Sequence, residues 1–360
     1  MSAEEPFCET TLADAHYYYL YNIQGYIETP ICIIGVIFNI FNILVFTRRN
    51  MISPVNLIFT HLAFADLSML LAYILHVWVT VVAYYRNESY KASTYTAAAL
   101  YLRSKELINI SHHVSVCLIM MLAIWKYIAV FSPSKERQWC NMKTTRNTVM
   151  AVYIACVLLA IPLHLSHHVV TYSLDKAGTE YIHVPFDEVD PIAVEISMII
   201  RGLLFDLLPS VVLGISSVRL FVVLRMKKEH PNLSSNVENR TDNVETKQQI
   251  KGSVIILIII VTLCLSFVIP LGLLDLLYVV LTRDKYSIYR PCTNSLLGIL
   301  SILNCFNKCV TFVVYYTMDQ DFRATFKSLF EKCNIFIGKQ NYFVLNNMRR
   351  NDESSETNGV

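Results

Sequence analysis

Seven long apolar stretches follow one another along the chain, with short polar segments between them. A helix needs roughly 20 mostly apolar residues to cross the hydrocarbon core of a bilayer, and each stretch reaches that length. The sixth is the clearest, because residues 253–281 contain a single charged side chain, Asp275. The pattern predicts seven transmembrane helices, at approximately residues 27–47, 55–83, 99–131, 147–171, 191–224, 252–282 and 292–317.

The third stretch is the weakest of the seven, because charged residues and two histidines interrupt it. We still expect it to cross the membrane. The basic residues place the two chain ends on opposite sides of the membrane, which requires an odd number of crossings. No internal repeat of the transporter kind is visible. The interrupting residues are Arg103, Lys105, Glu106, His112 and His113.

Composition agrees with a membrane protein, since only 16% of the residues are charged and the mean hydropathy is +0.44. Soluble domains carry about 25% charged residues. The net charge of +2 gives no reason to expect nucleic-acid binding. The ten cysteines are scattered without metal-ligand spacing, and His164, His167 and His168 lack spaced Cys or Glu partners, which favours an interfacial position over a metal site. We therefore expect an all-α seven-transmembrane helix bundle that is not an enzyme and holds no metal or cofactor.

The distribution of basic residues predicts the orientation. If the N-terminus lies outside, 19 of the 30 Lys and Arg residues fall in inner segments and 6 in outer ones. Inner loops carry such an excess in multi-pass proteins. The first 26 residues contain no Lys or Arg, so no cleavable signal peptide is expected. We expect a plasma-membrane protein with an extracellular tail over residues 1–26, a receptor domain over 27–333 and a cytoplasmic tail over 334–360.

Short motifs along these spans carry a family resemblance. In chain order they are Asn39 to Val45, Met51 to Asn56, Leu62 to Asp66, Trp125-Lys126-Tyr127, Pro209, Pro270, and Tyr315 followed by Phe322-Arg323. In this order and spacing they resemble the rhodopsin-like (class A) G-protein-coupled receptors. Within that class the chain looks like a divergent nematode-type member of the invertebrate FMRFamide and myosuppressin neuropeptide receptor branch.

The resemblance implies a function and several partners. A receptor of this branch binds an extracellular ligand, here an amidated FMRFamide-like neuropeptide, contacts membrane lipid, and signals to a cytosolic heterotrimeric G protein. Lys126, Tyr127 and Tyr315 match the family's G-protein coupling positions. A chemosensory receptor for a small molecule is the main alternative. A retinal-binding photoreceptor is a weaker one, because Cys305 occupies the place of the opsin lysine and Lys308 lies almost one turn deeper.

The chain also departs from the family pattern. Tyr101 stands where the class has the helix-three cysteine of its outer disulfide, and residues 171–190 contain no cysteine. The usual helix-six tryptophan is Val268, and the usual proline near the end of helix seven is Phe312. We expect the outer face to be held by other contacts, and G-protein coupling does not transfer automatically.

An internal polar core is expected where charges lie deep in the spans. Asp66 matches the carboxylate that helps bind sodium in the family, and Lys308 replaces a small polar group beside it. Because an unpaired buried charge is costly, we predict an Asp66–Lys308 pair whose ammonium takes the electrostatic role of sodium. The alternative is that Lys308 reaches toward another cavity. The other members of the expected core are Asn42, Ser115, Asn307 and Thr311.

Ligand contacts are expected in the outer halves of the spans. A peptide ending in Arg-Phe-amide needs a carboxylate for its arginine, and Glu106 and Asp275 are the best candidates. They could instead pair internally with Lys105, Arg201 or Arg103. The full set of expected ligand-binding residues is Glu106, His112, His113, Arg201 and Asp275.

Four residues in the tails, in the loops or at the start of a span are candidates for modification. Asn87 lies in a glycosylation sequon of the first outer loop. Cys8 and Cys292 face the oxidising side and are a possible disulfide.

Residues 319–330 predict a short amphipathic eighth helix on the inner leaflet, with Phe322, Phe326 and Phe330 on one face. Cys333 follows it and is a possible palmitoylation site, with a free thiol as the alternative.

Overall fold

The computed structural model describes residues 25–86, 95–166, 168–173, 181–186, 196, 198–229, 244–280, 283–329 and 331. Seven of the described helices are long and apolar enough to span a membrane, which confirms the seven predicted spans. In chain order the spanning helices are α2 (Thr29–Phe46), α3 (Pro54–Arg86), α4 (Tyr95–Phe131), α6 (Met142–Ser166), η3 (Ile200–Leu207) continued by α8 (Leu208–Glu229), α9 (Val244–Val280) and α10 (Arg283–Met318).

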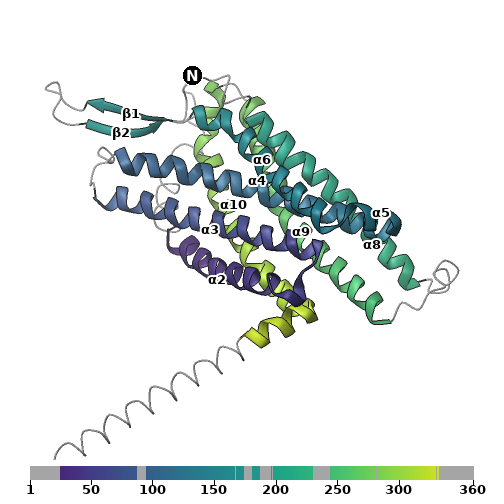
Figure 1. The fold of residues 1–360 in the computed structure, drawn as a ribbon. Helices are drawn as coiled ribbons and strands as arrows, with labels where there is room; N and C mark the ends of the chain where they lie inside the picture. The colour runs from purple at the N-terminus through teal and green to yellow at the C-terminus, as the bar shows by residue number, and fades with distance from the viewer. Residues whose placement is uncertain are drawn as a thin grey trace, which may run out of the picture.

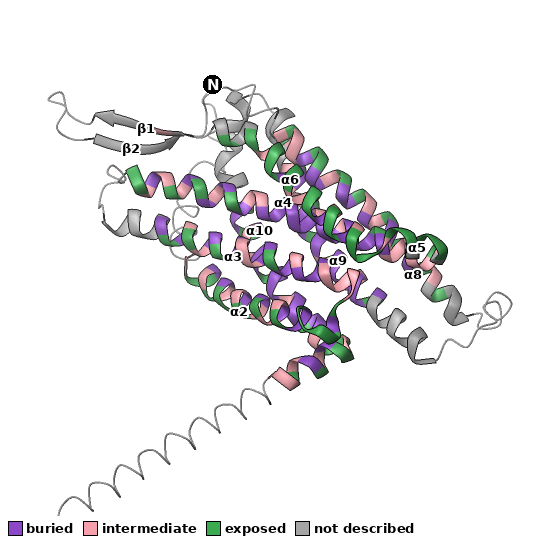
Figure 2. Ribbon diagram, in the orientation of Figure 1, coloured by how far each residue is buried: buried purple, intermediate pink, exposed green. Residues whose placement is uncertain are grey.

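The helices form one bundle with α4 at its centre (Figure 1). α4 packs against α3, α6, α8, η3 and α9, while α10 closes the bundle against α2 and α9. Figure 2 shows the buried residues gathered on the inward faces and the exposed ones on the outward faces. The exposed residues of the spans include many large apolar side chains, as expected for surfaces that face lipid.

The fourth span ends earlier than predicted. The predicted span runs to residue 171, but α6 ends at Ser166. After it, β1 (His168–Ser173) pairs antiparallel with β2 (Tyr181–Phe186). Both strands are rich in the β-branched and aromatic residues that favour strands, and a short apolar run does not distinguish a helix from a strand. This hairpin projects from one end of the bundle (Figure 1), which we call the hairpin end.

The opposite end carries α5 (Pro133–Trp139), and we call it the α5 end. The chain between residues 320 and 329 is also helical. The carboxylate of Asp319 accepts a hydrogen bond from the Phe322 N–H at 3.0 Å, which satisfies a free donor at the start of this helix. This agrees with the short eighth helix that the sequence predicts.

The aromatic face of the eighth helix does not lie on the membrane leaflet as expected. Phe322 is 0% exposed and packs against Phe46 and Tyr315, with ring centroids 5.1 and 5.7 Å away. Phe326 packs edge-on against Phe41 at 5.4 Å. The neighbouring faces of α2 and α10 are aromatic too, and their rings pack against those of Phe322 and Phe326. Phe330 lies outside the described residues.

The fifth span begins with an irregular segment. η3 is a π-helix, and the N–H of Leu208 at its end bonds to the carbonyl of Leu203. Pro209 follows directly, and a proline has no N–H to offer to the carbonyl four residues before it. A wider turn before the proline accommodates this loss, and such π turns are frequent at functional sites.

Candidate functional site

A buried ion pair lies near the middle of the bundle. The ammonium Nζ of Lys308 in α10 lies 2.8 Å from Oδ1 of Asp66 in α3, and the two side chains are 4% and 2% exposed. The hydroxyl of Ser115 in α4 donates to the same Asp66 oxygen at 2.8 Å and accepts from Lys308 at 2.6 Å. Three helices therefore meet at one triangle of polar groups.

The backbone carbonyl of Lys308 is a second polar contact point beside the ion pair. The hydroxyl of Thr311 donates to the carbonyl oxygen of Lys308 at 3.0 Å, and the amide of Asn39 donates to the same oxygen at 3.2 Å. Asn42 and Asn307 are buried, and their amide oxygens have no hydrogen-bond partner among the described residues. Asn39 was not in the predicted core, although it stands in the first-helix motif.

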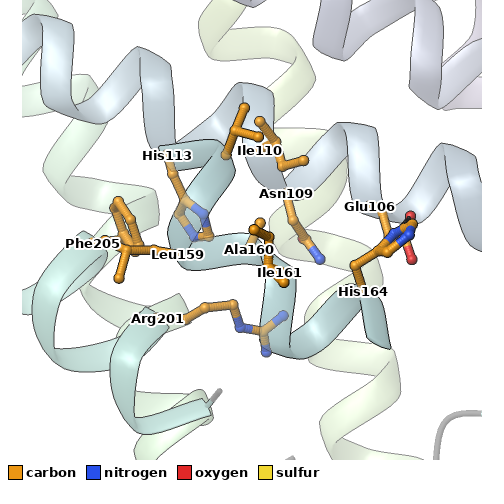
Figure 3. Close-up of a pocket in the computed structure, with 11 residues that line it drawn as sticks. Glu106, Asn109, Ile110, His113, Leu159, Ala160, Ile161, His164, Arg201 and Phe205 are labelled. Carbon is orange, nitrogen blue, oxygen red and sulfur yellow. Dashed lines mark hydrogen bonds and ion pairs between the residues drawn. The ribbon is translucent and has the colours of Figure 1, made fainter. Parts of the chain in front are cut away.

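A pocket opens nearer the hairpin end, between α4, α6 and η3 (Figure 3). Its cavity volume is about 240 Å³. Three of the expected ligand-binding residues, Glu106, His113 and Arg201, line it. The other lining residues are Asn109 and Ile110 from α4, Val157, Leu159, Ala160, Ile161 and His164 from α6, and Phe205 from η3.

The carboxylate of Glu106 already has partners in this pocket. Its Oε2 lies 2.7 Å from Nη1 of Arg103, one turn away on α4, and 2.8 Å from Nδ1 of His164 on α6. The Glu106 side chain is 10% exposed, whereas those of Arg103 and His164 are 48% and 51% exposed. The pairing of Glu106 with Arg103 agrees with the alternative that this carboxylate pairs inside the protein. His164, expected at the membrane interface, is a second partner.

The two neighbouring histidines of α4 point in different directions. The ring of His113 stacks on Phe205 of η3 at 4.4 Å and faces the pocket. His112 is not among the lining residues: its Nε2 lies 3.4 Å from Oδ1 of Asp206, and its ring packs edge-on against Phe267 of α9. His112 therefore belongs to the contact between α4, η3 and α9.

The contact between η3 and α9 is very close at Gly272. A Cβ built on this glycine would lie 2.7 Å from the Cβ of Asp206 and 3.4 Å from the carbonyl oxygen of Gly202. Gly272 follows Pro270, which lies inside α9. Both carboxylate oxygens of Asp206 lack a hydrogen bond among the described residues. Sequence reasoning did not predict this junction, although Asp206 in an apolar span marks a buried functional group.

The remaining predicted positions are only partly described. Asp275 lies in α9 and Cys292 in α10, but their side chains fall outside the description. Asn87, Cys8 and Cys333 lie outside the described residues altogether. Seven cysteines within the described part of the chain are free thiols. No group of three side chains that could hold a metal ion occurs within that part.

The family model for the serpentine type 7TM GPCR chemoreceptor Srw matches residues 26–333. The chain belongs to this Srw receptor family. It is therefore a seven-helix G-protein-coupled receptor and a multi-pass membrane protein.

Two known receptors are similar to this Srw receptor over most of its length. It is 24% identical over 322 residues to a sex peptide receptor of Drosophila melanogaster, an alignment that covers 87% of this chain and 73% of the relative. It is also 24% identical over 357 residues to the G-protein coupled receptor dmsr-1 of Caenorhabditis elegans, which covers 87% of this chain and 69% of the relative.

At the α5 end of the Srw receptor lie the three positions predicted for G-protein coupling. The hydroxyl of Tyr127 accepts a hydrogen bond from Nη1 of Arg219 in α8 at 2.9 Å, a partner that sequence reasoning missed. Lys126 is half-buried near the end of α4. Tyr315 is 2% exposed inside the aromatic cluster. This end therefore joins α4 to α8 by a polar contact.

Proposed function

We propose that this Srw receptor binds an amidated, FMRFamide-like neuropeptide on the extracellular side of the plasma membrane and signals to a cytosolic heterotrimeric G protein. The hairpin end then lies outside and the α5 end inside, as the excess of basic residues in the loops of the α5 end favours. The similarity to a sex peptide receptor supports a peptide ligand. The rhodopsin-like motifs support placement in the class A neuropeptide branch.

One observation carries the peptide proposal: the Glu106 carboxylate is buried, whereas the Arg103 guanidinium that pairs with it is about half exposed. Arg103 lies one turn closer to the hairpin end, on the side from which a peptide would enter. A ligand guanidinium could take the place of Arg103 and keep a charge-assisted hydrogen bond to Glu106. The stacked rings of His113 and Phe205 would then offer an aromatic surface to a neighbouring phenylalanine.

Three further residues are proposed to contribute to ligand binding, and they differ in how close they lie to the pocket. Arg201 lines the same pocket and could contact a ligand carbonyl. Asp275 of α9 is proposed as a second carboxylate that could pair with the arginine of the peptide. His112 would act indirectly, because it contacts Asp206 and Phe267 rather than the pocket.

Coupling to the G protein is proposed for the α5 end. A G protein that binds there and separates α8 from α4 would break the hydrogen bond between Arg219 and Tyr127. Lys126 and Tyr127 stand in the coupling motif of the family, with lysine in place of the usual arginine. A lysine keeps the charge but lacks the fork of donors that a guanidinium offers.

A small-molecule chemoreceptor is the second candidate, and the size of the pocket favours it. The cavity of about 240 Å³ lies below the range of about 300–1,000 Å³ that is typical of ligand pockets. Such a volume suits a ligand of few atoms or a single side chain of a larger one. The retinal alternative receives no such support, because the Lys308 ammonium is engaged by Asp66 and Ser115.

A peptide library applied to cells that express the receptor, with a second-messenger readout, tests the proposal. Once an active peptide with an arginine is found, Glu106→Gln should lower its potency about 10–100-fold, because a charged hydrogen bond contributes about 1.5–3 kcal/mol. Arg103→Gln is the matched control, and potency should be kept or raised because the carboxylate becomes available. A receptor that ignores the library but responds to small volatile or water-soluble compounds would contradict the peptide proposal.

A further inference from the structure

We propose that the pocket between α4, α6 and η3 binds the anionic headgroup of a single-chain amphiphile that enters sideways from the bilayer. This inference does not depend on a peptide ligand, which would approach Glu106 from the hairpin end. The amphiphile would approach Arg201 from the lipid side. The two ligands thus use different entrances of one pocket, and Arg201 pairs with a charged group only in the amphiphile.

The first observation is the position of the pocket wall. The α6 residues Val157, Leu159 and Ile161 line the pocket, and they are 49%, 39% and 43% exposed. Val157 and Ile161 lie within a membrane-spanning segment, where an exposed apolar side chain faces lipid. The pocket therefore has an apolar edge that lipid chains can reach without passing through water.

The second observation is the polarity of the interior. Figure 3 shows the Arg201 side chain extending from η3 toward Ala160 and Ile161 of α6. Arg201 is the second residue of its membrane-spanning segment, so its guanidinium lies near the level of the charged lipid headgroups. Arg201 carries five N–H donors, so it can hold an acceptor from a ligand in addition to its other contacts. The Glu106 carboxylate, by contrast, already accepts from Arg103 and His164.

The chemistry of the ligand follows from these two observations. A guanidinium binds a carboxylate or a phosphate through two parallel hydrogen bonds. Asn109 and His113, also in the lining, add neutral polar groups beside Arg201. The cavity of about 240 Å³ admits a headgroup and the first part of a chain, but not a whole lipid. The remaining chain would extend over the exposed face of α6, in contact with the bilayer.

The test uses the full-length receptor in nanodiscs of neutral phosphatidylcholine and a photoreactive fatty acid with its diazirine near the carboxylate. After illumination, peptide mapping should place the label on residues 157–161 of α6 or on η3. Unlabelled oleate and lysophosphatidate serve as competitors with a carboxylate and a phosphate headgroup. Competition by either supports the site and shows which anion it prefers. Methyl oleate, which has the same chain without the charge, should compete at least about 10-fold less well.

Three variants complete the experiment. Arg201→Gln should lower the specific labelling at least about 10-fold, since the charged partner of the headgroup is lost. Val157→Trp should block the opening on the lipid side while leaving the interior of the bundle unchanged. Leu158→Trp is the matched control, because Leu158 is 57% exposed on the same helix but does not line the pocket, and labelling should be unchanged.

Two results would overturn the proposal. Labelling spread over all lipid-facing helices and equal in wild type, Arg201→Gln and Val157→Trp would show contact with the bilayer only. Equal competition by methyl oleate would show that the charge is not recognised. Because Val157 faces lipid, its variant should fold even if Arg201→Gln does not, and the proposal remains testable in either case.

Discussion

Lys308 Nζ lies 2.8 Å from Asp66 Oδ1, in a site where neither side chain is more than 4% exposed. The nearby hydroxyl of Ser115 both accepts from the ammonium and donates to the carboxylate. Each charge is thus neutralised by a partner on another helix. We propose that the ammonium has the electrostatic role that a sodium ion has beside the same carboxylate in rhodopsin-like receptors.

A double-mutant cycle tests this pair. Asp66→Asn leaves the ammonium without its counter-charge, and Lys308→Ser leaves the carboxylate without one. Each single change should cost about 3–5 kcal/mol of stability, because an uncompensated buried charge remains. The double change leaves no charge behind and should recover much of that loss, measured as thermal stability and surface expression. Single effects that simply add would show that the two side chains are energetically independent.

Sodium provides an independent check of the same pair. The melting temperature of the purified wild-type receptor should be equal in sodium chloride and in the chloride of a bulky organic cation. Lys308→Ser should respond differently if the vacated carboxylate regains a sodium site, and its stability should then rise with sodium concentration. Clear stabilisation of the wild type by sodium would contradict the proposed role of Lys308.

Gly272→Ala should destabilise the receptor. The added Cβ would lie 2.7 Å from the Cβ of Asp206, so α9 and η3 would have to move apart. Overpacking of this kind costs about 1–3 kcal/mol, and a thermal-unfolding assay in detergent measures it. Gly214→Ala is the matched control, because nothing lies within 4 Å of its Cβ position. That change should be neutral or slightly stabilising, since alanine favours a helix over glycine.

Phe312→Pro introduces the proline that rhodopsin-like receptors carry near the end of helix seven. The change should nevertheless lower the stability of this receptor. A proline inside α10 removes a backbone hydrogen bond and costs about 3 kcal/mol or more. It also removes the ring that stacks on Phe38 at 4.7 Å. Phe312→Leu separates the two effects, because it loses only the ring contact and should cost less. Equal stability of the two variants would mean that α10 tolerates a proline at this position.

The orientation can be tested with epitope tags. A tag at residue 236 should be invisible to antibody on intact cells and visible after permeabilisation, because the basic loops are expected in the cytosol. A tag before residue 26 is the control and should be visible without permeabilisation. Staining of residue 236 on intact cells would reverse the orientation and the proposed positions of peptide and G protein.

Hydropathy predicted six of the seven helices directly, because the bilayer imposes a minimum length that apolar runs reveal. The third helix, interrupted by charges, was predicted only with the help of the orientation, which requires an odd number of crossings. It did not predict the β1–β2 hairpin or the end of α6 at Ser166, where β-branched residues pair locally. The π turns of η3 were missed as well, since Pro209 signals a disturbance but not its geometry.

The polar core was more predictable than the pocket. Asp66 and Lys308 are rare charges in apolar spans, so the cost of burial alone suggested that they pair. The directions of His112 and His113 could not be predicted, because α4 is surrounded by protein and no polar face distinguishes its sides. Glu28 was missed for a different reason: it stands at the start of the first span, yet it is 0% exposed and accepts a hydrogen bond from Ser301 of α10.

The link from Arg103 and Glu106 to His164 ties α4 to α6 near the hairpin end, the region where rhodopsin-like receptors have a disulfide. Unlike a covalent bond, this link needs no oxidising compartment to form and is indifferent to reducing agents. It can also break and re-form within a single signalling cycle. Relative movement of α4 and α6 at this end is therefore open to a ligand that competes for one carboxylate, whereas a covalent crosslink would forbid it.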